Sequence, residues 1–130
     1  MENVEFKIIL NKKLMVSEAN NHDHWTVKAK RKKSINAHLL AVLSHAAANN
    51  QYSFILPCIV TLTRISPRLL NDDNLVYTLK YQRDCIADYL IPGLKPGRAD
   101  DDNSKILWEY AQEKGAVREY AIKVRIEKII

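Results

Sequence analysis

Hydrophobic positions in the first half of the chain predict two β-strands. In the stretch 4–10 every second residue is apolar, which is typical of a strand with one buried face. The side chains expected to face the core are Val4, Phe6, Ile8 and Leu10. The stretch 53–63 is apolar on both faces and rich in β-branched residues, so helices should cover it on at least one side. Pro57 indicates that this second strand lies at a sheet edge or carries a bulge.

Two other segments repeat their apolar residues at helical spacing. The first runs from about residue 25 to 48, and its repeating positions are Ile35, Leu39, Val42, Leu43 and Ala46. The second starts in the stretch 70–75, with Asp72 or Asp73 as the expected N-cap, and Pro92-Gly93 ends it. Its repeating positions are Leu75, Leu79, Ile86, Tyr89 and Leu90.

The last quarter of the chain predicts two more strands. Residues 106–111 are strand-like, residues 120–126 alternate between apolar and polar, and Gly115 between them indicates a turn. We therefore expect residues 106–126 to form a β-hairpin. The predicted order is β-α-β-α-β-β. With 130 residues the chain suits a single α/β domain, residues 1–130, with a mixed sheet and two main helices.

The charge of the chain favours a polyanionic partner. The net charge is +5 and the isoelectric point is near 9.2, which is typical of proteins that bind nucleic acid. Five cations lie near the start of the first predicted helix: Lys28, Lys30, Arg31, Lys32 and Lys33. Cations are unfavourable at a helix N-terminus unless an anion meets them, so a phosphate-binding surface and an ordinary solvated face both fit this run. Trp25 could stack on a base, but we expect it to anchor the core.

Other features bear on the compartment. An uninterrupted apolar run long enough to span a membrane is missing, and residues 1–5 lack the pattern of a signal peptide. Cys58 and Cys85 each sit in an apolar segment, which indicates reduced core residues of a cytoplasmic protein without a membrane partner. The His-Asp-His run at 22–24 favours a polar loop over a zinc site, because no further His or Cys ligands lie nearby.

Carboxylates gather at two places that flank the second predicted helix. The stretch 70–75 reads Leu-Asn-Asp-Asp-Asn-Leu, and residues 100–102 are all aspartate. Either cluster alone fits a helix cap or a turn. Because adjacent carboxylates repel and Mg²⁺ prefers oxygen ligands, the two clusters together in a basic protein favour a metal site. Lys80 follows Asp73 by seven residues, almost two helical turns, so both should point to one side of a continuous helix.

In this order the motifs resemble the RusA family of Holliday junction resolvases, chiefly its phage and prophage branch, over nearly the whole chain. The family's Asp-x-Asp-Asn-Leu stretch, which opens a helix, corresponds to residues 71–75. The helix then continues with Leu79-Lys80 and the Arg-Asp-Cys-Ile-Ala-Asp run at 83–88. The later Asp-Asp pair resembles Asp100-Asp101. The Trp-Glu-Tyr-Ala-Gln run at 108–112 resembles the start of the family's closing hairpin.

The resemblance implies a homodimeric, Mg²⁺-dependent endonuclease that cuts branched DNA such as four-way junctions, in the cytoplasm of a bacterial host, with Mn²⁺ as a substitute metal. Three family aspartates hold the metal, and two of them correspond to Asp73 and Asp101, with Asp102 as an alternative register. The first corresponds to Asn71, a neutral ligand for which the neighbouring Asp72 can substitute. The family's catalytic lysine position holds tyrosine in this chain, so Lys80, one turn later, is the expected catalytic lysine.

Phosphodiester hydrolysis independently suits such residues. It needs an activated water and stabilisation of the charge on the phosphate, and carboxylate-bound Mg²⁺ supplies both, while a lysine adds a further cation. The amide at Asn71 leaves a rival hypothesis, a catalytically inactive homologue that only binds junction DNA. A small interaction protein without a nucleic-acid role would leave the basic segment unexplained.

Overall fold

Four strands form one mixed sheet in the computed structural model, which describes residues 3–10, 12, 15, 24–49, 56–91 and 105–129. The strands are β1 (Asn3–Ile9), β2 (Cys58–Ser66), β3 (Ile106–Lys114) and β4 (Ala121–Lys128). Their order across the sheet is β1-β4-β2-β3. β2 is parallel to β3, whereas β4 is antiparallel to both β1 and β2. The predicted mixed sheet is therefore confirmed.

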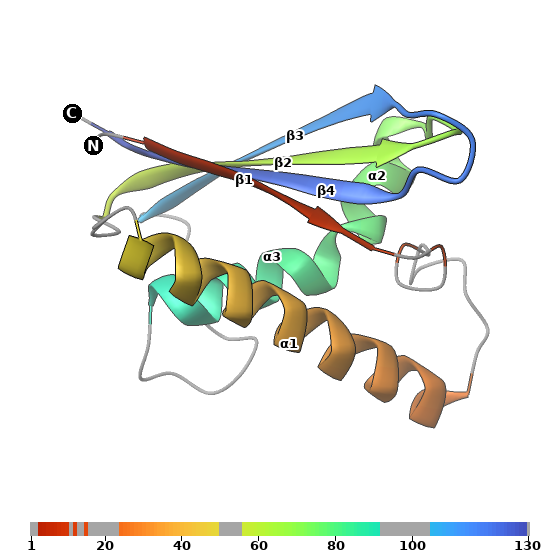
Figure 1. Ribbon diagram of the computed structural model, residues 1–130, viewed down its shortest axis with the longest axis horizontal. Helices are drawn as coiled ribbons and strands as arrows, with labels where there is room; N and C mark the ends of the chain where they lie inside the picture. Colours follow the sequence, from red (N-terminus) through yellow and green to blue (C-terminus); the bar gives the residue numbers. More distant parts are fainter. Residues whose placement is uncertain are drawn as a thin grey trace.

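The helices of the described chain are α1 (Trp25–Asn49), α2 (Asp72–Thr78) and α3 (Lys80–Leu90). In Figure 1, α1 and α3 lie along one face of the sheet, and α2 lies near the end at which β2 finishes. The α/β class and the chain order are confirmed, with one difference. The predicted second helix is present as two helices, α2 and α3.

A bend at Leu79 separates α2 from α3. Just before it, the Thr78 hydroxyl donates a 2.8 Å hydrogen bond to the Asn74 carbonyl. Thr hydroxyls that bond back to the preceding turn often bend helices. The chain accordingly changes direction between the two helices (Figure 1), and residues on either side of Leu79 do not share one continuous helical face.

The hydrophobic core lies between the sheet and the helices. In α1 the fully buried side chains are Ile35, Leu39 and Leu43, which recur every fourth residue and form one stripe. Of the side chains predicted to face the core from the first strand, Val4, Ile8 and Leu10 are buried and Phe6 is partly buried, which confirms the alternation. Cys58 and Cys85 are free and buried, also as predicted, and burial raises the pKa of each thiol to about 11.

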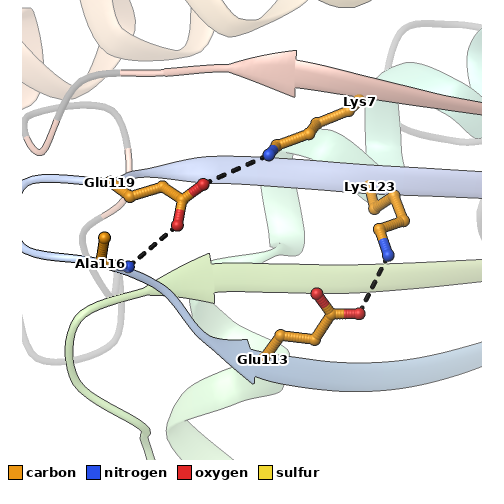
Figure 2. Close-up of polar contacts among 5 residues, drawn as sticks. All are labelled: Lys7, Glu113, Ala116, Glu119 and Lys123. Carbon is orange, nitrogen blue, oxygen red and sulfur yellow. Dashed lines mark hydrogen bonds and ion pairs between the residues drawn. The ribbon is translucent and has the colours of Figure 1, made fainter.

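The predicted hairpin over residues 106–126 is wrong, because β2 lies between β3 and β4. Thr63 of β2 is opposite Ala111 on one side and Lys123 on the other. In Figure 2 the Lys123 ammonium reaches across β2 to the Glu113 carboxylate at 2.9 Å. β2 is an inner strand, so the edge position inferred from Pro57 is wrong as well. Pro57 directly precedes the strand, where its missing N–H removes no ladder bond.

Residues 115–120 connect β3 to β4 and are held by one carboxylate. Glu119 accepts a 2.9 Å hydrogen bond from the Ala116 N–H and pairs with the Lys7 ammonium at 3.3 Å (Figure 2). The Ala116 N–H first, and then Lys7, lower the pKa of Glu119. The turn in this connection lies at Val117 and Arg118, two residues after the predicted position at Gly115. A Cβ there would lie only 2.7 Å from Glu119 Oε1, so a residue without a side chain suits this close approach.

Candidate functional site

The acidic turn, residues 71–73, begins α2 and is capped by Asn71. The Asn71 Oδ1 accepts a 3.0 Å hydrogen bond from the Asn74 N–H, so the expectation that Asp72 or Asp73 would be the N-cap is wrong. Asn caps a helix as well as Asp does. Its capping role places Asp72 and Asp73 in the first turn, where the helix dipole favours carboxylates and where both are exposed.

Gln112 of β3 fixes the position of this turn. Its Oε1 accepts a 2.9 Å hydrogen bond from the Leu70 N–H, and its Nε2 donates a 2.6 Å hydrogen bond to the Leu70 carbonyl. Both backbone polar groups of Leu70 are thereby satisfied by one amide. We call this pair of bonds the Gln112 clamp. The sequence does not predict this role for Gln112, because nothing local in it shows that a strand amide meets a backbone 42 residues away.

The carboxylates of the acidic turn suit a hard cation in part. Asp72 and Asp73 have no hydrogen-bond or ion-pair partner among the described residues. Within the same part of the chain, three His, Cys, Asp or Glu side chains do not come together as a ligand group. Mg²⁺ commonly uses one or two protein carboxylates together with water and substrate phosphate, and two free carboxylates meet that need. Asp101 and the rest of the second acidic cluster lie outside the described residues.

Lys80 is exposed at the start of α3. Because the helix bends at Leu79, the seven-residue spacing from Asp73 no longer sets the relative direction of the two side chains. Lys80 lines an open cavity of roughly 290 Å³ together with Val76, Tyr77, Arg83 and Tyr110. The Arg83 guanidinium donates a 2.6 Å hydrogen bond to the Tyr110 hydroxyl and lies 4.8 Å from the Trp108 ring centroid. Lys80 therefore belongs to a surface where cations and aromatic rings alternate.

The five cations of α1 divide between two sides of the helix. Lys30 and Lys33 are exposed, and Lys28 is half-buried. Arg31 is only 8% exposed and continues the buried stripe one turn before Ile35. Lys32 is half-buried, with its ammonium 5.4 Å from the Tyr81 ring centroid. A phosphate surface on α1 would therefore rely on Lys30 and Lys33 first.

Trp25 is not the core anchor that we expected, because it is 72% exposed at the first position of α1. It precedes Ile35 by ten residues, which turns it away from the buried stripe by about 80°. The His24 ring lies beside it, with centroids 5.5 Å apart. His24 also accepts a 3.2 Å hydrogen bond from the Thr26 N–H. The other two residues of the 22–24 run lie outside the described part of the chain.

No family model, curated protein or solved structure matches the chain. Within the described residues, no helix has both the length and the apolar character needed to cross a bilayer.

Proposed function

We propose that the protein is a Mg²⁺-dependent, structure-selective endonuclease that resolves four-way junctions and other branched DNA during phage or prophage recombination, repair or replication. The observation that supports this most is the clamped acidic turn. Asp72 and Asp73 are exposed and have no partner within the described residues, while the Gln112 clamp fixes the backbone just before them. Such carboxylates would repel a DNA phosphate unless a divalent cation lay between the two.

In this proposal Asp72, Asp73 and Asp101 hold Mg²⁺, or Mn²⁺ in its place. The bound metal would supply an activated water and stabilise charge on the phosphate. The Gln112 clamp keeps the backbone that leads into the acidic turn in register with β3, so this backbone need not be ordered when DNA binds. The Lys80 ammonium stabilises the negative charge that develops during cleavage.

The exposed cations of α1 hold flanking phosphates. Lys30 and Lys33 project into solvent from the N-terminal half of this helix. Contacts of this kind orient a duplex without reading its sequence, which suits an enzyme that selects the shape of a junction. We further propose that the protein acts as a homodimer, because a four-way junction has two-fold character and resolution needs two cuts. Light scattering on the protein, with and without junction DNA, should report two copies.

The direct test is a gel assay of a labelled four-way junction with and without Mg²⁺. Native protein should cut only with the metal, and Asp73→Asn should abolish cutting while leaving junction binding intact. Glu109→Gln is the matched control, because it removes an exposed carboxylate on β3 away from the turn. Cleavage that persists in EDTA, or native-like cleavage by Asp73→Asn, would overturn the assignment.

The capping bond of Asn71 favours a second candidate, a homologue that binds junction DNA without cutting it. The Asn71 Oδ1, which would replace a metal-binding carboxylate oxygen, already accepts the Asn74 N–H. A neutral oxygen shared in this way is a weak ligand for a hard cation. Junction binding without cleavage in either Mg²⁺ or Mn²⁺, by native protein and by Asn71→Asp, would establish this alternative.

A further inference from the structure

Arg64 is a buried cation that the proposed chemistry does not use. It lies near the end of β2 and is only 6% exposed. One guanidinium nitrogen donates a 2.7 Å hydrogen bond to the Arg68 carbonyl. Its Nε is buried and has no hydrogen-bond partner among the described residues. Buried charges are normally paired, and a buried donor without a partner needs an explanation.

Arg64 opens into a cavity of roughly 530 Å³ at the carboxyl end of β2. Three cations line it, Lys12, Arg64 and Arg68. The hydroxyl groups of Ser66 and Tyr120 and three apolar side chains, among them Leu70, complete the lining. None of the described residues that line the cavity carries a carboxylate. The cavity therefore concentrates positive charge without an acidic side chain among its described lining residues.

These features select the chemistry of the ligand. Arginine presents planar donors that match phosphate oxygens, and hydrogen bonds between ions of opposite charge are the strong ones. Three cations suit a phosphate better than a single carboxylate. The volume falls within the range of about 300–1,000 Å³ that is typical of small-ligand sites, so a sugar can accompany the phosphate. We propose that this cavity is a phosphate-binding site that receives a phosphate group of a nucleotide or of a nucleic-acid strand.

The electrostatic state of Arg64 agrees with this assignment. Burial lowers the pKa of its guanidinium, as expected for a cation that has lost water without gaining an anion. An arginine nevertheless stays protonated at neutral pH. The cavity thus holds a permanent positive charge, which a phosphate would neutralise.

The cavity adjoins the acidic turn. Leu70 is part of its lining, Asn71 is the next residue, and the Gln112 clamp holds Leu70 in place. A strand phosphate in the cavity would therefore lie at the same end of the sheet as the carboxylates that we propose for catalysis. That the phosphate belongs to DNA rests on the proposed function, whereas phosphate binding itself does not.

The first experiment measures the affinity for inorganic phosphate by isothermal titration calorimetry at constant ionic strength. Arg68→Gln and Arg64→Lys should each weaken binding by about tenfold or more, because each loses charge-assisted hydrogen bonds. Lys128→Gln is the matched control, since it removes one exposed cation next to the opposite end of β2 and should change nothing. Absence of binding by native protein, or equal weakening by Lys128→Gln, would overturn the site. Arg68 is exposed, so its variant decides the matter even if Arg64→Lys fails to fold.

A second experiment identifies the source of the phosphate by titrating a 5′-mononucleotide and a four-way junction. Weaker junction binding by Arg68→Gln, relative to Lys128→Gln, supports a DNA phosphate. If Arg68→Gln loses phosphate and mononucleotide binding but keeps its junction affinity, the DNA source is overturned and the site serves a free nucleotide. If native protein binds phosphate but no junction, the proposed function fails while the phosphate site stands.

Discussion

The Gln112 clamp predicts that one strand amide controls the order of the acidic turn. Gln112→Ala removes both hydrogen bonds to Leu70 and leaves its N–H and carbonyl without these partners in a half-buried position. The fold itself should survive, because Gln112 is a half-buried polar residue near the end of β3 and not part of the hydrophobic core. The effect should therefore be local, with a measurable loss of stability.

Its size follows from the two bonds. A neutral hydrogen bond contributes about 0.5–1.5 kcal/mol to net stability, so losing both lowers the free energy of unfolding by about 1–3 kcal/mol. With a urea dependence of about 2 kcal/mol per molar, a loss of about 2 kcal/mol lowers the unfolding midpoint by about 1 M. Lys114→Ala is the control for the change in strand propensity, because Lys114 is exposed on the same strand.

Urea unfolding gives the global effect, and amide hydrogen exchange locates it. Exchange should accelerate in Gln112→Ala at residues 70–75, while residues in the middle of β2 should change only as far as global stability changes. Gln112→Glu offers a second comparison, since a carboxylate can still accept from Leu70 N–H but cannot donate to its carbonyl. If Gln112→Ala and Lys114→Ala unfold at the same urea concentration with equal exchange at residues 70–75, the clamp does not hold the turn in solution.

Three other perturbations test separate parts of the molecule. Lys30→Ala with Lys33→Ala should weaken junction binding and reduce the slope of log affinity against log salt by about 1 for each lost phosphate contact; an unchanged slope would show that both lysines merely face solvent. Asn71→Asp preserves the helix cap and adds a charged ligand, so it should lower the Mg²⁺ concentration needed for cleavage. An unchanged Mg²⁺ requirement would show that Asn71 lies outside the metal site. Glu119→Gln should lower the thermal midpoint at neutral pH. Because the pKa of Glu119 is lowered in the folded state, its stabilisation is present above the unfolded pKa and disappears as acid protonates the folded carboxylate; a difference that stays constant in acid would contradict this.

The local pattern of apolar residues predicts the helices and strands, but it does not predict which strands are neighbours in the sheet. The alternation along β1 and the stripe of Ile35, Leu39 and Leu43 in α1 each express burial of one face, so the sequence predicts both correctly. Pairing depends on partners far along the chain. The six residues 115–120 are long enough to join adjacent strands or to pass β2, since two strand spacings are only about 10 Å. Two strand-like runs on either side of Gly115 predict a hairpin, because consecutive strands are usually neighbours in a sheet.

The candidate site shows the same limit. Acidic residues at 71–73 are visible in the sequence as a cluster, but periodicity reveals neither the bend at Leu79 nor the Thr78 hydroxyl bond that precedes it. The basic run likewise gives no sign that Arg31 turns inward while Lys30 and Lys33 face solvent. The sequence does not predict that Arg64 is buried, because a single cation at the end of an apolar strand is typical of an ordinary strand terminus.

The carboxyl ends of β2 and β3 lie at the same end of the sheet, which explains why the cavity and the acidic turn come together. Because β2 and β3 are parallel, both strands finish at the same end of the sheet, with Ser66 opposite Lys114. A parallel pair requires a crossover connection. The connection from β2 to β3 begins with α2. Arg64 of β2, Gln112 of β3 and the acidic turn of the crossover are thereby gathered at one place, as is usual for ligand sites at the carboxyl ends of strands in open α/β sheets.

That arrangement places opposite charges at the same end of the sheet without pairing them. Within the described residues, Arg64 has no anionic partner, and the carboxylates of the acidic turn have no cationic partner. A phosphate in the cavity and Mg²⁺ on the turn would neutralise both and attract each other. The two proposals together therefore predict positive coupling: phosphate should tighten Mg²⁺ binding by the same factor by which Mg²⁺ tightens phosphate binding. Calorimetric titrations of each ligand in the presence of the other measure that factor, and Arg68→Gln should reduce it whereas Lys128→Gln should not. Independent binding of the two ligands would mean that the cavity and the acidic turn serve separate purposes.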